Sequence, residues 1–187
     1  MGQISYPMPS KLIFSIISNK ESLFLESKDF LERTFGKIDL ESDYQPFDFT
    51  DYYKNEMGVF LKQKIISFEK LIQPNSLSKI KNISNKMELQ IIQGGGVDNS
   101  ILTNRKVNLD PGYITLSKFI LASTKDGSAR IYMDRGIFAE ITLTFTKKSF
   151  KPLEWTYQNY QTELFINFLN SVREKYKNQI KLLHNST

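Results

Sequence analysis

The pattern of hydrophobic and polar positions predicts strands and helices in alternation over the first half of the chain. A short apolar run at 11–18 is typical of a buried strand. The next segment carries an apolar stripe at helical spacing, so we expect a helix at 21–35, begun by Asn19 as N-cap and ended by Gly36. The remaining elements expected here are an extended segment at 38–49, a helical turn that Thr50 and Asp51 begin and Met57 ends, an extended or mixed segment at 58–68, and a helix from Pro74 to about Ile92.

The second half of the chain predicts a β-meander followed by a long helix. Strands are expected at 113–123, 129–133 and 137–146, joined by glycine-containing turns. Apolar and polar residues alternate along 137–146, which is typical of an antiparallel strand buried on one face. A closing segment at 164–183 has apolar residues at helical spacing and should cover the sheet. The elements together predict an α+β fold, with a mostly antiparallel or mixed sheet and helices packed on one of its faces.

Length and composition favour a single domain. The chain has 187 residues, and 40% of them are hydrophobic, which is enough to bury a full core. We expect this domain to span 1–187, with flexible termini at 1–10 and 182–187 and a flexible loop at 93–104. That loop contains three consecutive glycines, but no Lys-Ser/Thr follows them, so it is not a P-loop.

Several classes of protein are disfavoured by what the sequence lacks. No apolar run approaches the ~20 residues of a membrane helix, and the first residues have neither the basic start nor the apolar core of a signal peptide. We therefore expect a cytoplasmic protein with no membrane partner. The chain has no cysteine, which excludes disulfides and thiolate ligands, so we expect no zinc, haem or iron–sulfur cluster. The net charge is +5, but no Lys/Arg block gives a strong nucleic-acid signal, and the oligomeric state stays open.

Four carboxylates are candidate metal ligands. The single histidine, His184, lies near the end of the chain, so any metal is expected to be a hard cation such as Mg²⁺ or Mn²⁺ held by oxygen ligands. With such a cation the four carboxylates would suit a hydrolase or transferase. Structural explanations stay open, because an acidic residue can favour a helix N-terminus and another can lie on an exposed sheet face. The candidates are Asp48, Asp51, Asp110 and Glu140.

A second group of polar residues suits an anion. Ser123, Thr124 and Lys125 end an apolar strand, and Arg130 returns on the neighbouring one. Two hydroxyls, an ammonium and a guanidinium at one strand end can bind a phosphate by charge-assisted hydrogen bonds. The alternative is an ordinary solvated turn.

Asn108 and Asp110 extend this candidate site. They flank a predicted Asp110-Pro111-Gly112 turn on one side of an extended segment, so their oxygens could face the same sugar hydroxyl or metal. Arg105 lies close by in sequence and is a further candidate for contact with an anion.

Aromatic residues offer a third possibility, a non-catalytic module that binds a protein partner. Tyr52, Tyr53, Trp155 and Tyr157 would then form an apolar partner surface. Alternatively, Trp155 and its neighbours, including Tyr160, stack a base or pin the last helix to the sheet.

Blocks along nearly the whole chain resemble an uncharacterised bacterial family, domain of unknown function family 4416. The matching blocks are Phe47-Asp-Phe-Thr-Asp-Tyr-Tyr53, Glu56-Met-Gly58, Ile80-Lys81 with Asn85 and Glu88, Arg105, Asn108-Leu-Asp-Pro-Gly-Tyr113, Leu121-Ala-Ser-Thr-Lys-Asp126, Arg130-Ile-Tyr132, Gly136-Ile-Phe-Ala-Glu140 and Trp155-Thr-Tyr157. The chain departs from the family at Gln158-Asn159, where Pro-Asp is expected, and in its glycine loop.

The resemblance implies little about activity. Family members often carry an automated "GTP-binding protein" label, and in the absence of a P-loop such binding would need another mode. We treat the label as favouring a phosphorylated ligand. The leading hypothesis is therefore a cytosolic module that binds a nucleotide or another phosphorylated small molecule, and whether the protein is an enzyme stays open.

Overall fold

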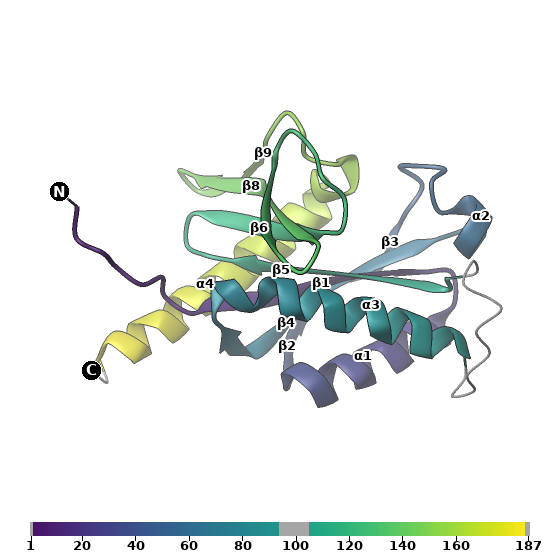
Figure 1. The fold of residues 1–187 in the computed structure, drawn as a ribbon, viewed down its shortest axis with the longest axis horizontal. Helices are drawn as coiled ribbons and strands as arrows, with labels where there is room; N and C mark the ends of the chain where they lie inside the picture. The colour runs from purple at the N-terminus through teal and green to yellow at the C-terminus, as the bar shows by residue number, and fades with distance from the viewer. Residues whose placement is uncertain (1, 94–104, 186–187) are drawn as a thin grey trace.

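The structure is a computed structural model that describes residues 2–93 and 105–185 (Figure 1). Its strands are β1 (Ser10–Ser18), β2 (Ile38–Glu41), β3 (Gln45–Pro46), β4 (Lys62–Ile72), β5 (Val107–Ile114), β6 (Lys118–Ser123), β7 (Arg130–Asp134), β8 (Ile137–Thr146) and β9 (Ser149–Pro152). Its helices are α1 (Glu21–Phe35), α2 (Lys54–Met57), α3 (Leu77–Gln93) and α4 (Glu163–Asn185), with short 3₁₀ turns at Pro74–Ser76 and Gln158–Tyr160. The predicted glycine loop falls mostly outside the described residues.

All nine strands of the described residues belong to one antiparallel sheet, which confirms the α+β prediction. The strand order is β2-β4-β1-β5-β6-β8-β7, with β3 added beside β4 and β9 beside β8. β1 lies between β4 and β5 in the interior of the sheet, and its nine residues are all buried. An uninterrupted buried strand requires cover on both faces of the sheet.

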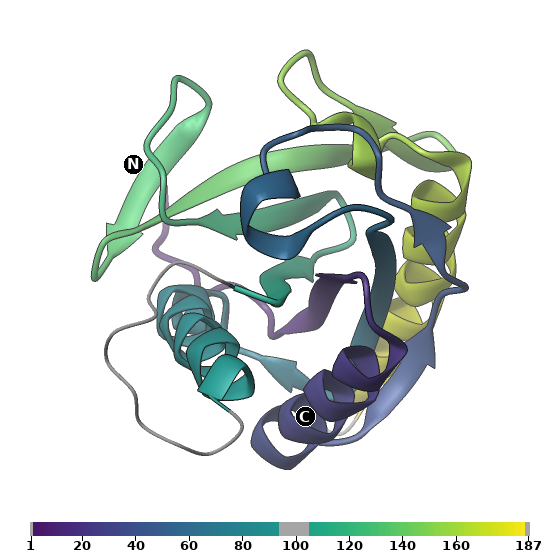
Figure 2. The ribbon, with the colours of Figure 1, turned by 90° about the vertical axis from the view of Figure 1, so that its right-hand side faces the viewer.

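Helices cover both faces of the sheet, so the prediction that they lie on one face was wrong. Leu12, Phe14 and Ile16 of β1 pack against α1 and α3, which lie side by side. The alternate residue Ile13 belongs to a second core that α4 completes with Phe165, among others. Figures 1 and 2 show α4 on a different side of the sheet from α1 and α3. The apolar run at 11–18 carries hydrophobic residues on both of its faces because both are covered.

The predicted N-terminal helix has the expected bounds, Glu21–Phe35, and Gly36 follows it at φ +97° with its N–H bonded to the Glu32 carbonyl at 2.9 Å. The predicted N-cap was wrong. Lys20 occupies the N-cap position without a side-chain cap, while the Asn19 amide donates to the Met57 carbonyl at 2.9 Å. Asn19 thus joins the start of α1 to the end of α2. The helical turn α2 is also shorter than predicted and starts at Lys54.

The predicted strand at 113–123 is in fact two strands, β5 and β6. The chain reverses between them, and the Thr115 N–H bonds to the Lys118 carbonyl at 2.9 Å. The predicted Asp110-Pro111-Gly112 turn was wrong as well, because these residues lie inside β5. Pro111 is in register with Phe14 of β1 on one side, and on the other side it lies just outside the positions that β6 pairs, Gly112 to Ile114. Proline is tolerated in a strand where a neighbouring strand is missing on one side.

The remaining elements of the second half agree with the sequence pattern. β7 and β8 match the last two predicted strands, and the short strand β9 was not predicted. The amphipathic helix α4 covers the sheet as expected, and it continues to Asn185, into the segment predicted as a flexible terminus. Among the described residues, no helix is long and apolar enough to cross a membrane.

Candidate functional site

The candidate site lies where β5 and β6 separate. These strands pair at three positions only, from Gly112 to Ile114. Beyond them, side chains of α3 take the place of a neighbouring strand for Leu109. Glu88 accepts the Leu109 N–H at 2.7 Å, while Lys81 and Ser84 donate to the Leu109 carbonyl at 3.0 and 3.1 Å. The main chain of β5 is thereby satisfied without β6, so the two strands are free to part.

A pocket of about 590 Å³ lies between the separating strands β5 and β6, an arrangement that we call the fork. Its wall is built from β5 and the residue Arg105 before it, α3, β6 with the turn that follows it, the segment before α2 and the segment 156–160, with one residue each from β1 and β7. All seven residues predicted to contact a ligand line it: Arg105, Asn108, Asp110, Ser123, Thr124, Lys125 and Arg130. Residues predicted separately in sequence therefore belong to one cavity.

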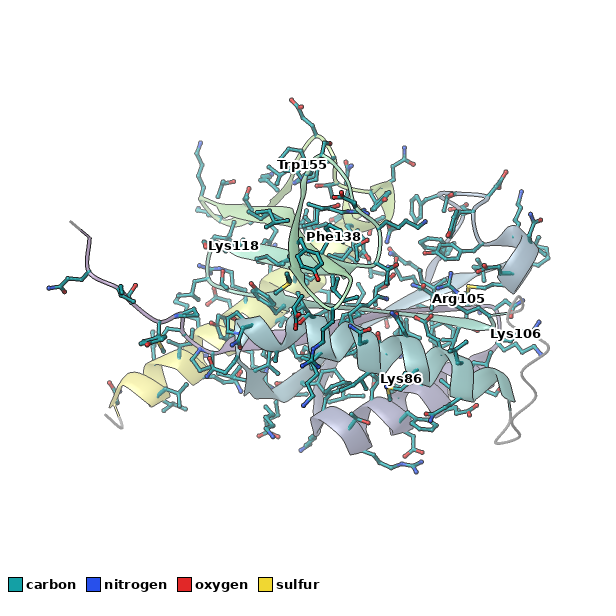
Figure 3. The ribbon with its side chains drawn as sticks, viewed as in Figure 1. Lys86, Arg105, Lys106, Lys118, Phe138 and Trp155 are labelled. Carbon is teal, nitrogen blue, oxygen red and sulfur yellow. The ribbon has the colours of Figure 1, made fainter. Side chains whose placement is uncertain are left out.

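Arg105 lies at one end of the pocket, beside α2 in Figure 3. Its guanidinium contacts Glu88 at 3.2 Å and Glu56 at 3.1 Å, and it donates to the side-chain amide oxygen Oδ1 of Asn108 at 2.9 Å. It also lies 5.3 Å from the centre of the Tyr53 ring. Burial by itself would lower the pKa of Arg105, but the charge and hydrogen bond of Glu88, with the charges of Tyr53 and Glu56, together outweigh it and the pKa is raised. Arg105 is thus a permanent cation held from several sides.

Asn108 and Asp110 share one face of β5, as predicted, and are joined by a hydrogen bond from the Asn108 amide to the Asp110 carboxylate. Asp110 also accepts from the Lys81 ammonium at 2.8 Å. Behind them, burial raises the pKa of Glu88. The polar groups at this end form one continuous network rather than independent ligands.

Arg130 organises the opposite end of the pocket. It faces Glu140 across the β7–β8 pair and bonds that carboxylate at 2.8 Å. It also donates to the Lys125 carbonyl at 2.9 Å and to the Tyr157 hydroxyl at 3.0 Å. Glu140 is only 4% exposed, so the alternative of an exposed sheet face does not describe it.

The turn after β6 presents Thr124 and Lys125 to solvent at the same end. The Ser123 hydroxyl is engaged within this turn, since it accepts the Lys125 N–H at 3.0 Å. The Lys125 ammonium lies 3.9 Å from the centre of the Tyr52 ring. Among the described residues it makes no ion pair, which distinguishes Lys125 from the other cations of the pocket.

The four carboxylates predicted as metal ligands are not brought together. Asp48 is exposed, Asp51 pairs with Lys54 at 2.7 Å, and Asp110 and Glu140 lie in the two separate networks already described. Across residues 2–93 and 105–185, no three or more acidic, His or Cys side chains gather so as to hold a metal ion. Of the four, Asp110 is the one that lines the pocket.

The predicted aromatic surface divides in a similar way. Tyr52, Tyr53 and Tyr157 line the pocket, whereas the Trp155 indole donates to the Ile141 carbonyl at 2.9 Å and lies near β9, away from Arg105 (Figure 3). Tyr160 is buried with its ring 4.8 Å from that of Phe165, so it does fix α4 to the sheet.

Sequence reasoning missed the contribution of α3. Lys81, Ser84 and Glu88 recur at three- and four-residue spacing among the buried apolar residues of that helix, including Met87. Charged residues on the buried face of a predicted helix are a readable signal of a polar network beneath it. Of these three residues Lys81 lines the pocket itself, and further polar residues of the wall that were not proposed include Asn85, Thr156 and Asn159.

The fold and the site define an α+β protein with a polar pocket in a forked antiparallel sheet. The family model described as "Domain of unknown function (DUF4416)" matches residues 8–176, and the chain belongs to this family. The match includes every residue of the pocket wall. Comparison with curated proteins and with solved structures gave no match.

Proposed function

We propose that the pocket binds a nucleotide or another phosphorylated small molecule. The observation that carries the proposal is the convergence of four cationic side chains and several aromatic rings on one cavity of about 590 Å³. Small-molecule sites are concave, commonly occupy ~300–1,000 Å³, and combine apolar walls with a few placed polar groups. The four cations are Lys81, Arg105, Lys125 and Arg130.

The phosphate is expected at the end formed by Thr124, Lys125 and Arg130. Lys125 is exposed and unpaired among the described residues, so its ammonium can bind an anion without first breaking an ion pair. Arg130 is held in place by Glu140, which orders its guanidinium beside the same turn. Charge-assisted hydrogen bonds of this kind are the strong ones in proteins.

The rest of the ligand would extend toward Arg105. Tyr52, Tyr53 and Tyr157 line the cavity, with Lys125 over the Tyr52 ring and Arg105 over the Tyr53 ring. A planar group can stack among these rings and cations, and base–aromatic stacking contributes ~1–3 kcal/mol per base. Asn108 and Asp110 offer an amide and a carboxylate for sugar hydroxyls. A Mg²⁺ or Mn²⁺ ion arriving with the phosphate would find Asp110 as a carboxylate ligand in the wall.

A thermal-shift panel of nucleoside phosphates, with and without Mg²⁺, tests the proposal. We expect at least one compound to raise the melting temperature. Lys125→Ala should lower the affinity for that compound about tenfold, because a charge-assisted hydrogen bond contributes ~1.5–3 kcal/mol. Lys86→Ala is the matched control, since Lys86 is exposed on α3 outside the pocket (Figure 3) and the substitution removes the same charge. An equal effect of the two substitutions, or no shift with any compound, would contradict the proposal.

A further inference from the structure

The two ends of the pocket carry different charge. Among the side chains that line the pocket and their ion-pair partners, the end with the turn after β6 has two cations and one carboxylate. Arg130 and Glu140 are both nearly buried and bonded at 2.8 Å, so they neutralise one another. Lys125 remains, with no carboxylate partner among the described residues, and this end keeps one positive charge.

The opposite end has two cations and three carboxylates. Arg105 contacts Glu56 and Glu88, and Lys81 contacts Asp110. With Glu88 ionised this end has one net negative charge, and with Glu88 protonated it is neutral. It is never positive, so it does not favour a second phosphate.

We propose that the ligand carries a single phosphate group attached to a ring-bearing compound, as in a nucleoside monophosphate; this inference rests on the proposed function. One phosphate matches the one free ammonium, together with the Thr124 hydroxyl and the Arg130 guanidinium. A second or third phosphate would bring further negative charge to a pocket that has no further unpaired cation in the described residues, and would approach the carboxylates at the other end. The pocket selects against polyphosphates by charge.

A series that varies only the phosphate number tests this inference. Adenosine and guanosine, with their 5′-mono-, di- and triphosphates, are titrated by calorimetry into the full chain in the presence of EDTA. We expect a monophosphate to bind about tenfold tighter than its nucleoside, and its di- and triphosphate to bind no tighter than the monophosphate. Affinity that climbs from mono- to triphosphate overturns the inference but leaves the proposed function standing. Absence of binding by every phosphate in this titration overturns the inference, and absence of a shift in the thermal-shift panel as well removes the proposed function.

A charge substitution gives an independent test in the same protein. Glu140→Gln keeps the size of the side chain and releases the charge of Arg130, so the anion end gains one positive charge. The affinity for the diphosphate should then rise about tenfold relative to the affinity for the monophosphate, which is the effect of one charge-assisted contact. The ratio of the two affinities is the readout, since a general loss of folded protein lowers both alike. Glu154→Gln, at an exposed position outside the pocket wall, is the matched control and should leave the ratio unchanged.

Because Glu140 is buried, a second variant covers the case in which Glu140→Gln does not fold. Thr124→Lys adds a cation at an exposed position of the pocket wall and disturbs no buried group. It should likewise raise the preference for the diphosphate about tenfold. An unchanged diphosphate-to-monophosphate ratio in the folded variants would show that charge does not set the selectivity.

Discussion

At the scale of single residues, Gly112 brings β5 and β6 together at the point where the fork begins. A Cβ atom at this position would lie 2.5 Å from the Ile120 carbonyl oxygen and 2.6 Å from the Phe119 ring. The first neighbour is backbone and the second is a buried ring, so neither can move away cheaply. The glycine is required by close approach rather than by a turn, contrary to the prediction from the Asp-Pro-Gly sequence.

We therefore expect Gly112→Ala to lower the free energy of unfolding by about 1–3 kcal/mol, the usual cost of overpacking. Gly127→Ala is the control, because its Cβ would meet nothing closer than 3.5 Å and should change stability by less than about 0.5 kcal/mol. Urea denaturation of the two variants measures both values. Equal stability of the two would show that β6 can shift at no cost.

The individual residues of the pocket were partly predictable from the sequence. Lys125 and Arg130 stand out in the sequence because they are charged residues at the ends of apolar segments. In the structure both line the same cavity. Glu140 was recognised only as an ambiguous carboxylate, since its partner Arg130 is defined by strand register. Register depends on the whole sheet, so this pairing could not be derived from the spacing of the two residues.

At the scale of elements, the predicted helices were the most reliable part of the sequence analysis. An apolar stripe with Gly36 after it defines the end of α1, and Pro74 defines the start of the helical segment at α3. The β5–β6 reversal was missed because both strands are apolar around it and the turn at 115–117 has no Gly or Pro. The hydrophobic periodicity of a strand indicates which of its faces is buried, but it does not indicate where a long apolar segment reverses direction.

A buried ion pair joins β1, β2 and α4. Lys11 is fully buried and bonds Asp39, with Gln179 of α4 as a second acceptor at 2.8 Å. Asp39 also accepts from Ser67 at 2.6 Å. Burial alone would raise the pKa of Asp39, but the bonds from Lys11 and Ser67 outweigh it, and the pKa is lowered from the ordinary 3.8.

This pair predicts a component of acid sensitivity. A carboxyl whose pKa is lowered by folding contributes its full stability above the unfolded value, here 3.8, and loses it as pH falls through the lower folded pKa. In Asp39→Asn this pH-dependent contribution to stability should be absent. At neutral pH the free energy of unfolding of the variant should be lower by about 3–5 kcal/mol, because Lys11 is left buried without its carboxylate partner.

Denaturation of this variant between pH 7 and about 2 measures both effects, with Asp43→Asn, at an exposed position, as the control. A parent protein and an Asp39→Asn variant with the same pH profile would show that the pair does not couple folding to protonation.

At the scale of the whole molecule, one continuous sheet joins two halves that the sequence presents as different. The first half has alternating strands and helices, and the second is a meander, yet β1 of the first pairs with β5 of the second. The α4 core draws on both, since Leu169 packs in the same cluster as Ile65 of β4 and Leu143 of β8. We therefore expect the protein to unfold as one cooperative unit.

Leu169→Ala tests this expectation. Leu169 is fully buried, and truncating a buried leucine costs about 2–5 kcal/mol in lost burial and cavity formation. Far-UV circular dichroism reports the helices, while the fluorescence of Trp155, the single tryptophan of the chain, reports the segment beside β8. The two unfolding curves should coincide in the parent and shift together in the variant, because a cavity beneath α4 weakens every strand that contributes to that core. If only the circular dichroism curve moved, the meander would be an independent unit. The pocket, which needs β5 from one side of the fork and β6 from the other, would then depend on the docking of two domains rather than on one fold.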